Sequence, residues 1–162
     1  MYKVADIFCG AGGLSYGFSK YPHFELIWAN DIDKDAILSY QANHKEAQTI
    51  LCDIVQLHCH NLPCVSIDIL LGGPPCQSYS TLGKRKMDEK ANLFKEYLRL
   101  LDLVKPKIFV FENVVGLKPL KQKSQISLVF GMNATNLQYN IPIHFVSSVG
   151  STQSYAFIRY DV

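Results

Sequence analysis

Short apolar runs alternate with segments of helical periodicity along most of this 162-residue chain. Strands are predicted at Lys3–Phe8, Phe24–Asn30, Thr49–Leu51, Val65–Leu71 and Ile108–Phe111. Helices are predicted from the turn after the first strand to about Lys20, from the N-cap Asp33 to about His44, and over Ala91–Val104. Regular alternation of strand and helix predicts an α/β fold class with a mostly parallel, doubly wound sheet.

The composition excludes few classes of protein. Hydrophobic residues make up 48%, charged residues 19%, and the formal net charge is +2, so any surface for nucleic acid must be local. The 5 cysteines are an odd number scattered along the chain, which favours a reducing compartment. With no visible signal peptide and no apolar run of membrane length, we expect a cytoplasmic location.

Cys76 follows an unusual segment of two glycines and two prolines, here called the proline arm. The predicted strand Val65–Leu71 ends in two glycines, Pro74 and Pro75 then fix the backbone, and a polar loop follows the thiol. A lone cysteine is more often a small core residue, but a core cysteine needs neither the prolines nor the polar continuation. The pattern therefore predicts a thiol presented at the carboxyl edge of an open sheet, where α/β proteins bind ligands.

The glycine-rich segment Cys9–Ser15 after the first strand is typical of a nucleotide-type site, although Ser15 stands where a dinucleotide fingerprint has glycine. Asp31 and Asp53 end the second and third strands, and a carboxylate there can accept hydrogen bonds from ribose hydroxyls. Each aspartate alone is more often a cap or turn residue. Their occurrence at successive strand ends favours a nucleotide-like ligand.

Glu112 follows the apolar fifth strand, where a carboxylate is costly to leave unpaired and an apolar environment raises its pKa. The alternative is that Glu112 is a structural acid with a satisfied hydrogen bond. Its expected position on the same edge of the sheet as Cys76 favours a role as a proton donor to a substrate ring nitrogen. The segment His58–Cys64 matches no standard zinc spacing, so no metal site is predicted. Lys84 belongs to a basic set expected in a charged, flexible loop over residues 84–90, which is either a solvated loop or a phosphate contact.

Five stretches resemble, in order and spacing, the amino-terminal motifs of the cytosine-5 DNA methyltransferases, especially the bacterial restriction–modification enzymes. They are Asp6–Leu14, Asn30-Asp31, Cys52–Ile54, Gly73–Ser78 and Phe111–Val114. The match covers roughly residues 1–120, and Pro-Pro-Cys-Gln followed at a distance by Glu-Asn-Val is its most specific part. The resemblance implies a Rossmann-like S-adenosylmethionine-dependent methyltransferase fold that acts on DNA.

The resemblance also implies roles for individual residues. Cys76 is the expected nucleophile, and Glu112 is expected to engage the target base. The implied S-adenosylmethionine site comprises Phe8, Gly10, Gly12, Gly13, Asp31, Ile32, Asp53, Ile54, Pro75 and Leu93. The implied contacts with DNA are Gln77, Ser78, Ser80, Lys84 and Asn113.

The family's downstream Gln-x-Arg-x-Arg segment, target-recognition domain and returning helix are absent from this sequence. We expect residues 1–120 to form the cofactor-binding and catalytic core. Residues 121–162 are expected to end it with a helix over Gln125–Phe130 and a hairpin of Tyr139–Val149 and Ser154–Tyr160. The chain then resembles a truncated copy or one subunit of a split enzyme whose second polypeptide carries the recognition half.

Three alternatives stay open from the sequence. They are a cofactor-binding fragment without turnover, a nicotinamide oxidoreductase, and a transfer-RNA cytosine-5 methyltransferase with the same motifs.

Overall fold

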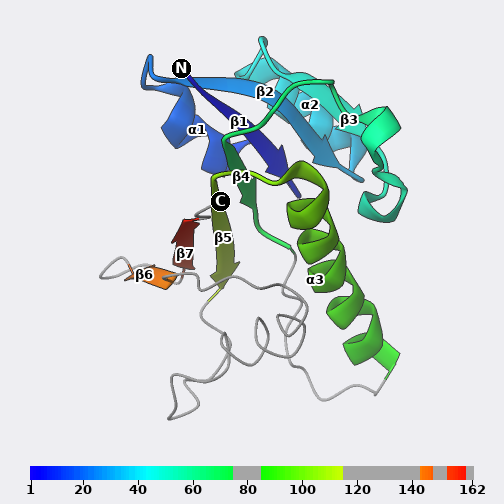
Figure 1. Cartoon of the computed structure of the whole chain (residues 1–162). Helices are drawn as coiled ribbons and strands as arrows, with labels where there is room; N and C mark the ends of the chain where they lie inside the picture. Colours follow the sequence, from blue (N-terminus) through cyan, green and yellow to red (C-terminus); the bar gives the residue numbers. More distant parts are fainter. Residues whose placement is uncertain (75–84, 115–142, 148–152, 160–162) are drawn as a thin grey trace.

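The computed structural model describes residues 1–74, 85–114, 143–147 and 153–159 (Figure 1). The strands are β1 (Tyr2–Ile7), β2 (Phe24–Asp31), β3 (Gln48–Leu51), β4 (Ile69–Gly72), β5 (Ile108–Val114), β6 (Ile143–Ser147) and β7 (Gln153–Arg159). The α-helices are α1 (Gly13–Ser19), α2 (Lys34–Asn43) and α3 (Arg85–Val104), and the short 3-10 helices are η1 (Ile54–Gln56) and η2 (Cys59–Asn61).

The strands form one 7-stranded sheet in the order β3-β2-β1-β4-β5-β7-β6. The first five strands along the chain pair in parallel, whereas β7 runs antiparallel between β5 and β6, as the opposed arrows show in Figure 1. The predicted mostly parallel, doubly wound sheet is confirmed, and so is the hairpin at its edge. The chain moves outward from β1 to β3 and then returns to β4, so the direction of winding reverses between β1 and β4.

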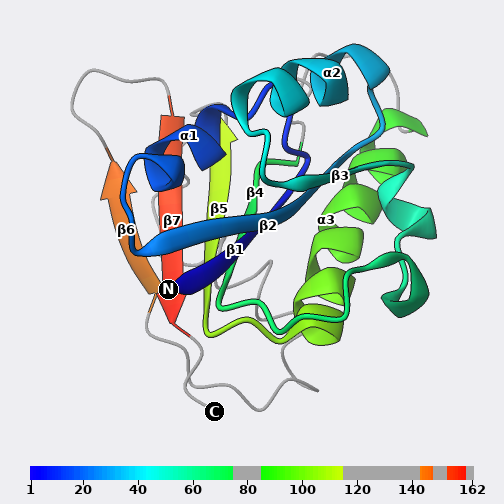
Figure 2. The ribbon, with the colours of Figure 1, turned by 90° about the horizontal axis from the view of Figure 1, so that it is seen from above.

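Alternating side chains of the central strands supply two cores on opposite faces of the sheet. On one face, Leu70 and Phe109 pack in a cluster with Tyr97 and Leu100 of α3. On the other face, the cluster of Val4, Ile69, Leu71 and Val110 packs against Leu14 and Phe18 of α1. Figure 2 shows α1 and α2 on the side of the sheet away from α3. Both faces of the parallel strands are therefore covered by helices, which explains the continuous apolar runs in the sequence.

Two predicted boundaries are wrong. The fourth strand begins at Ile69 rather than at Val65. The Asp68 backbone still bonds to Lys3 and Ile108, but its carboxylate accepts the Lys3 N–H at 2.9 Å, so no backbone carbonyl before Asp68 pairs with that N–H. Helix α3 begins at Arg85 rather than at Ala91, so residues 85–90 are helical and not a flexible loop. That segment contains mainly good helix formers, whose propensity the charge pattern obscured. The helix predicted over Gln125–Phe130 lies outside the described residues.

None of the helices in the described part of the chain combines the length and apolar character needed to cross a bilayer.

The end of β4 is closely packed on the α3 side. A Cβ atom at Gly72 would lie 2.6 Å from Tyr97 Cε2 and 2.8 Å from Ile7 Cγ1. Gly72 pairs with Ile7 and with Phe111 on the two neighbouring strands, so the backbone there has little room to move. Glycine at this position allows α3 to approach the carboxyl end of the sheet.

We predict that Gly72→Ala lowers the free energy of unfolding by about 1–3 kcal/mol, the usual cost of overpacking a closed core. Gly17→Ala is the matched control, because a Cβ atom at this exposed position of α1 meets nothing within 4 Å. That variant should be neutral or more stable by about 1 kcal/mol, since alanine is the better helix former. Urea unfolding curves measure both, and equal midpoints for the two variants would contradict the packing account.

Candidate functional site

The carboxyl ends of β1 to β5 meet at one edge of the sheet. Ile7 pairs with Asn30 on one side and with Gly72 on the other, and Gly72 pairs with Phe111. Each of the five sequence motifs includes the carboxyl end of one of these strands or follows it directly. The sequence-predicted convergence of strand ends is therefore present in the structure.

The segment of residues 8–12 that follows β1, here called the glycine turn, has unusual backbone geometry. Phe8, Gly10 and Gly12 have φ angles of 56°, 53° and 90°, and the Gly12 N–H donates to the Cys9 carbonyl at 2.9 Å. A Cβ atom at Gly12 would lie 2.5 Å from His44 Nε2. Glycine is therefore required at position 12 both by the left-handed backbone and by the lack of space. Phe8 is the unusual residue, since a bulky side chain at positive φ is a strained position of the kind found at functional sites.

Asp31 ties the end of β2 to the glycine turn. Its Oδ2 accepts the Gly10 N–H at 2.9 Å, and its Oδ1 accepts the Asp33 N–H at 3.0 Å. A carboxylate offers about four lone-pair sites, so acceptor capacity remains for hydroxyl groups of a ligand. The neighbouring Ile32 side chain is 67% exposed, which leaves an apolar surface beside the carboxylate.

A buried polar network lies beneath the glycine turn, and the sequence analysis missed it. Asp6 of β1 is 1% exposed, and its Oδ2 accepts the Ser15 Oγ–H at 2.6 Å. Tyr40 Oη of α2 lies 2.8 Å from the same Ser15 Oγ. Ser15 thus has a structural reason to replace the glycine of the dinucleotide fingerprint. An acid inside the apolar run of β1 was the available signal, because a buried carboxylate needs a partner.

The carboxyl end of α2 also holds the glycine turn. Asn43 Nδ2 donates to the Ala11 carbonyl at 3.1 Å, and His44 Nε2 lies 3.1 Å from the Gly12 carbonyl oxygen. Because a carbonyl only accepts, His44 carries its proton on Nε2. The turn is therefore fixed by side chains that are 32 residues away in the sequence.

The third strand end is held by β2 and α3. The Asn30 amide donates to the carbonyls of Ile50 at 2.9 Å and Cys52 at 3.0 Å, and Asp53 caps η1 by accepting the Val55 N–H at 3.0 Å. Arg99 of α3 donates to the Ile54 carbonyl at 2.8 Å. Asp53 therefore stands at the edge on a braced segment, whereas the Ile54 side chain is buried in the core.

Glu112 lies at the end of β5 against the backbone of Gly73. A Cβ atom at Gly73 would lie 2.7 Å from Glu112 Oε2, so glycine leaves the space that the carboxyl group occupies. Glu112 Oε1 is buried and has no hydrogen-bond partner among the described residues. Burial raises the pKa of Glu112 above its usual range, as the sequence analysis expected.

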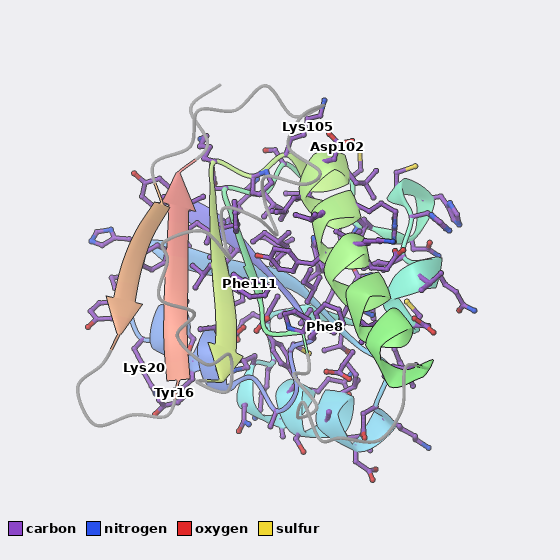
Figure 3. All side chains as sticks on the ribbon, turned by 90° about the horizontal axis from the view of Figure 1, so that it is seen from below. Phe8, Tyr16, Lys20, Asp102, Lys105 and Phe111 are labelled. Atoms are coloured by element: carbon purple, nitrogen blue, oxygen red, sulfur yellow. The ribbon has the colours of Figure 1, made fainter. Side chains whose placement is uncertain are left out.

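Cys9 of the glycine turn is a buried free cysteine. Burial, followed by the nearby carboxylates Asp6 and Asp31, raises the pKa of the Cys9 thiol far above its usual value. Since the thiolate is the nucleophile, Cys9 is inert. Phe8 of the turn and Leu93 of α3 are both partly buried against the core cluster that contains Phe111, and Figure 3 shows Phe8 and Phe111 on the α3 side of the sheet.

Other predicted residues have no described geometry. Pro75, Cys76, Gln77, Ser78, Ser80 and Lys84 lie outside the described residues. Asn113 belongs to β5, but its side chain is not described. Gly13 opens α1 on the surface. Within the described ranges, no three His, Cys, Asp or Glu side chains are grouped so as to hold a metal ion.

Comparison with known proteins identifies the family. The model of the C-5 cytosine-specific DNA methylases matches residues 2–149. The type II methyltransferase M.Bsp6I of Bacillus sp. (strain RFL6) is 42% identical over 120 residues, which are 72% of this chain and 37% of that protein. The type II methyltransferase M.FnuDI of Fusobacterium nucleatum is 43% identical over 117 residues, which are 71% of this chain and 33% of that protein.

A solved structure shares the fold. The crystal structure of the S. pombe Dnmt2 methyltransferase aligns with 98% of this chain and 49% of that chain, with a TM-score of 0.69 and 21% sequence identity. This chain spans about a third of the length of the two curated relatives. The family model matches residues 2–149, and the strand order and the glycine turn of the structure are consistent with that match. The chain belongs to the C-5 cytosine-specific DNA methylase family.

Proposed function

We propose that this protein transfers a methyl group from S-adenosylmethionine to C5 of cytosine in DNA. The observation that carries the proposal is the position of Glu112, whose buried Oε1 has no hydrogen-bond partner among the described residues and lies at the same sheet edge as the glycine turn. Cys76 follows Gly73 by three residues, and a chain of that length spans at most about 11 Å. The chain therefore tethers the thiol near the carboxyl group that would hold the base.

The residues present fit the cofactor that the family uses. Asp31 has acceptor sites left for two ribose hydroxyls, and Asp53 is a second acid on the same edge. The exposed Ile32 offers an apolar surface for an adenine ring. Gly10, Gly12 and Gly13 let the cofactor approach the backbone, and Phe8, Pro75 and Leu93 would line the side toward α3. Ile54 would contribute through its backbone, because its side chain is buried.

The reaction would proceed through a covalent adduct of the base. The target cytosine leaves the DNA stack, because its C6 atom cannot be attacked inside a duplex. The Cys76 thiolate forms a bond to C6, and the electron pair of the C5–C6 double bond makes C5 nucleophilic. The methyl group that C5 then takes would come from S-adenosylmethionine, whose S–CH3 bond breaks to leave S-adenosylhomocysteine. A base, for which water is a candidate, removes the C5 proton, and the resulting electron pair restores the double bond as the Cys76 sulfur leaves.

Glu112 would stabilise the base during this attack. A raised pKa increases the fraction of Glu112 that is protonated at a given pH, and a protonated carboxyl group can donate to N3 of cytosine. Its other oxygen can accept a hydrogen bond from the exocyclic amine. The contact with N3 strengthens as negative charge develops on the ring, so it favours the transition state over the ground state, whereas the contact with the amine orients the base.

Contacts with DNA would come from the polar loop and from the end of β5. We propose that Gln77, Ser78, Ser80, Lys84 and Asn113 contact DNA around the extruded cytosine. The named relatives are type II methyltransferases, so a role in a bacterial restriction–modification system, acting in the cytoplasm, is the natural setting. The transfer-RNA alternative is tested by comparing methyl incorporation into duplex DNA and into RNA. A requirement for a second polypeptide is tested by adding a candidate recognition subunit.

We predict that Cys76→Ser abolishes methylation in any assembly that methylates DNA, while binding of S-adenosylhomocysteine stays nearly unchanged. The physical reason is that Cys76 acts on the base, whereas the cofactor is bound at the ends of β1, β2 and β3. Tritiated methyl transfer measures the first effect, and calorimetric titration measures the second.

Cys59→Ser is the matched control, because Cys59 is exposed in η2. It should keep both properties. A loss of cofactor affinity in Cys76→Ser that equals its loss of activity would show that Cys76 has a structural role.

We also predict that Asp31→Ala weakens cofactor binding by about 1–3 kcal/mol, the usual cost of leaving polar partners unpaired. Asp35→Ala removes the same charge from an exposed position in the first turn of α2 and should bind normally. Calorimetric titration of both variants tests the assignment. An unchanged dissociation constant for Asp31→Ala would remove this residue from the site.

A further inference from the structure

The glycine turn is held from below by a chain of buried polar groups. Ser15 has a single hydroxyl proton, which it donates to Asp6 Oδ2 at 2.6 Å. Tyr40, at 2.8 Å, must therefore donate to Ser15 Oγ. All three side chains are at most 1% exposed. A directed chain of hydrogen bonds thus runs from α2 through the first turn of α1 to β1.

The same helix contacts the glycine turn at a second point. The Tyr40 ring lies 4.6 Å from the His44 ring, and His44 Nε2 reaches the Gly12 carbonyl at 3.1 Å. Asn43 holds the Ala11 carbonyl. Movement of α2 would therefore pull the carbonyl groups of the turn and the Ser15 anchor together.

We infer that Asp6 is a positioning residue for cofactor binding, which acts through Ser15 and Tyr40 to hold the glycine turn in its binding geometry. The inference rests on the proposed function, because it assumes that the turn binds the cofactor. The Asp6 carboxylate lies beneath the turn and is buried, so a ligand on the surface cannot contact it directly. Its effect on a ligand must pass through the residues it holds.

Protonation of Asp6 distinguishes this role from simple packing. Burial raises the pKa of Asp6 to about 7, the Ser15 hydrogen bond lowers it, and the Asp31 carboxylate raises it. Cys9 in the turn, Tyr40 of α2 and Tyr97 of α3 also face Asp6, and burial raises the pKa of each, so they remain neutral near pH 7. Asp6 Oδ1 has no hydrogen-bond partner among the described residues, so Ser15 is the neighbour there whose hydrogen bond favours the ionised form.

The ionised carboxylate is the stronger acceptor for Ser15. The form that holds the turn is therefore present above about pH 7 and is lost as the pH falls through the pKa of Asp6. If only this form binds the cofactor, the apparent affinity scales with its population, and the dissociation constant should rise about tenfold between pH 8 and pH 6. Asp6→Asn keeps an acceptor for Ser15 and cannot ionise, so its profile should be flat.

The experiment compares wild type, Asp6→Asn, Ser15→Ala and Tyr40→Phe with Ile69→Val. Ile69 lies at the amino end of β4, away from the turn, and serves as a control for general loss of packing. Hydrogen–deuterium exchange of residues 8–14 is measured without ligand, and S-adenosylhomocysteine affinity is measured by calorimetry from pH 6 to pH 8. Ser15→Ala and Tyr40→Phe should speed exchange in the turn and weaken binding about 5- to 150-fold, the usual range for coupled sites.

Exchange and affinity in Ser15→Ala and Tyr40→Phe that match Ile69→Val would overturn the inference. A tenfold pH effect that persists in Asp6→Asn would also overturn it, because the titrating group would then be another residue. If the wild type bound no cofactor, the proposed function would fail, and the exchange measurement would still decide whether this network holds the turn.

Discussion

The parallel pairing of β1 with both β2 and β4 is the constraint on which the rest of the molecule depends. Because the first five strands run in one direction, every segment that follows a strand begins at the same edge of the sheet. Residues far apart in the sequence are thereby brought together at that edge. The reversal of winding between β1 and β4 opens the sheet for a ligand at that edge.

This geometry separates the proposed site into two parts. The ends of β1, β2 and β3 carry the glycine turn, Asp31 and Asp53, and these parts are braced by Asn30, Arg99 and the end of α2. The ends of β4 and β5 bring Gly73 against Glu112. We propose that the first part binds the cofactor and the second presents the base.

The mostly parallel sheet and most strand ends could be predicted from the sequence, because apolar runs and their terminating glycines and acids are local signals. The start of β4 was misplaced because the Asp68 carboxylate accepts the N–H of Lys3, which is distant in sequence. The start of α3 was misplaced because charge was weighed above helix propensity. In the site, Asp31 and Glu112 were found because they end strands, but the Asp6, Ser15 and Tyr40 network was missed. Its members lie on three elements, and nothing local shows that their side chains meet.

The glycine turn and the Asp31 carboxylate at the end of β2 are proposed to bind one ligand together. A crystal structure of the protein with S-adenosylhomocysteine would test this proposal. We expect ribose oxygens within hydrogen-bond distance of Asp31 and the ligand backbone against the glycine turn. A ligand bound elsewhere, or an Asp31 carboxylate that faces away from the ribose, would contradict it.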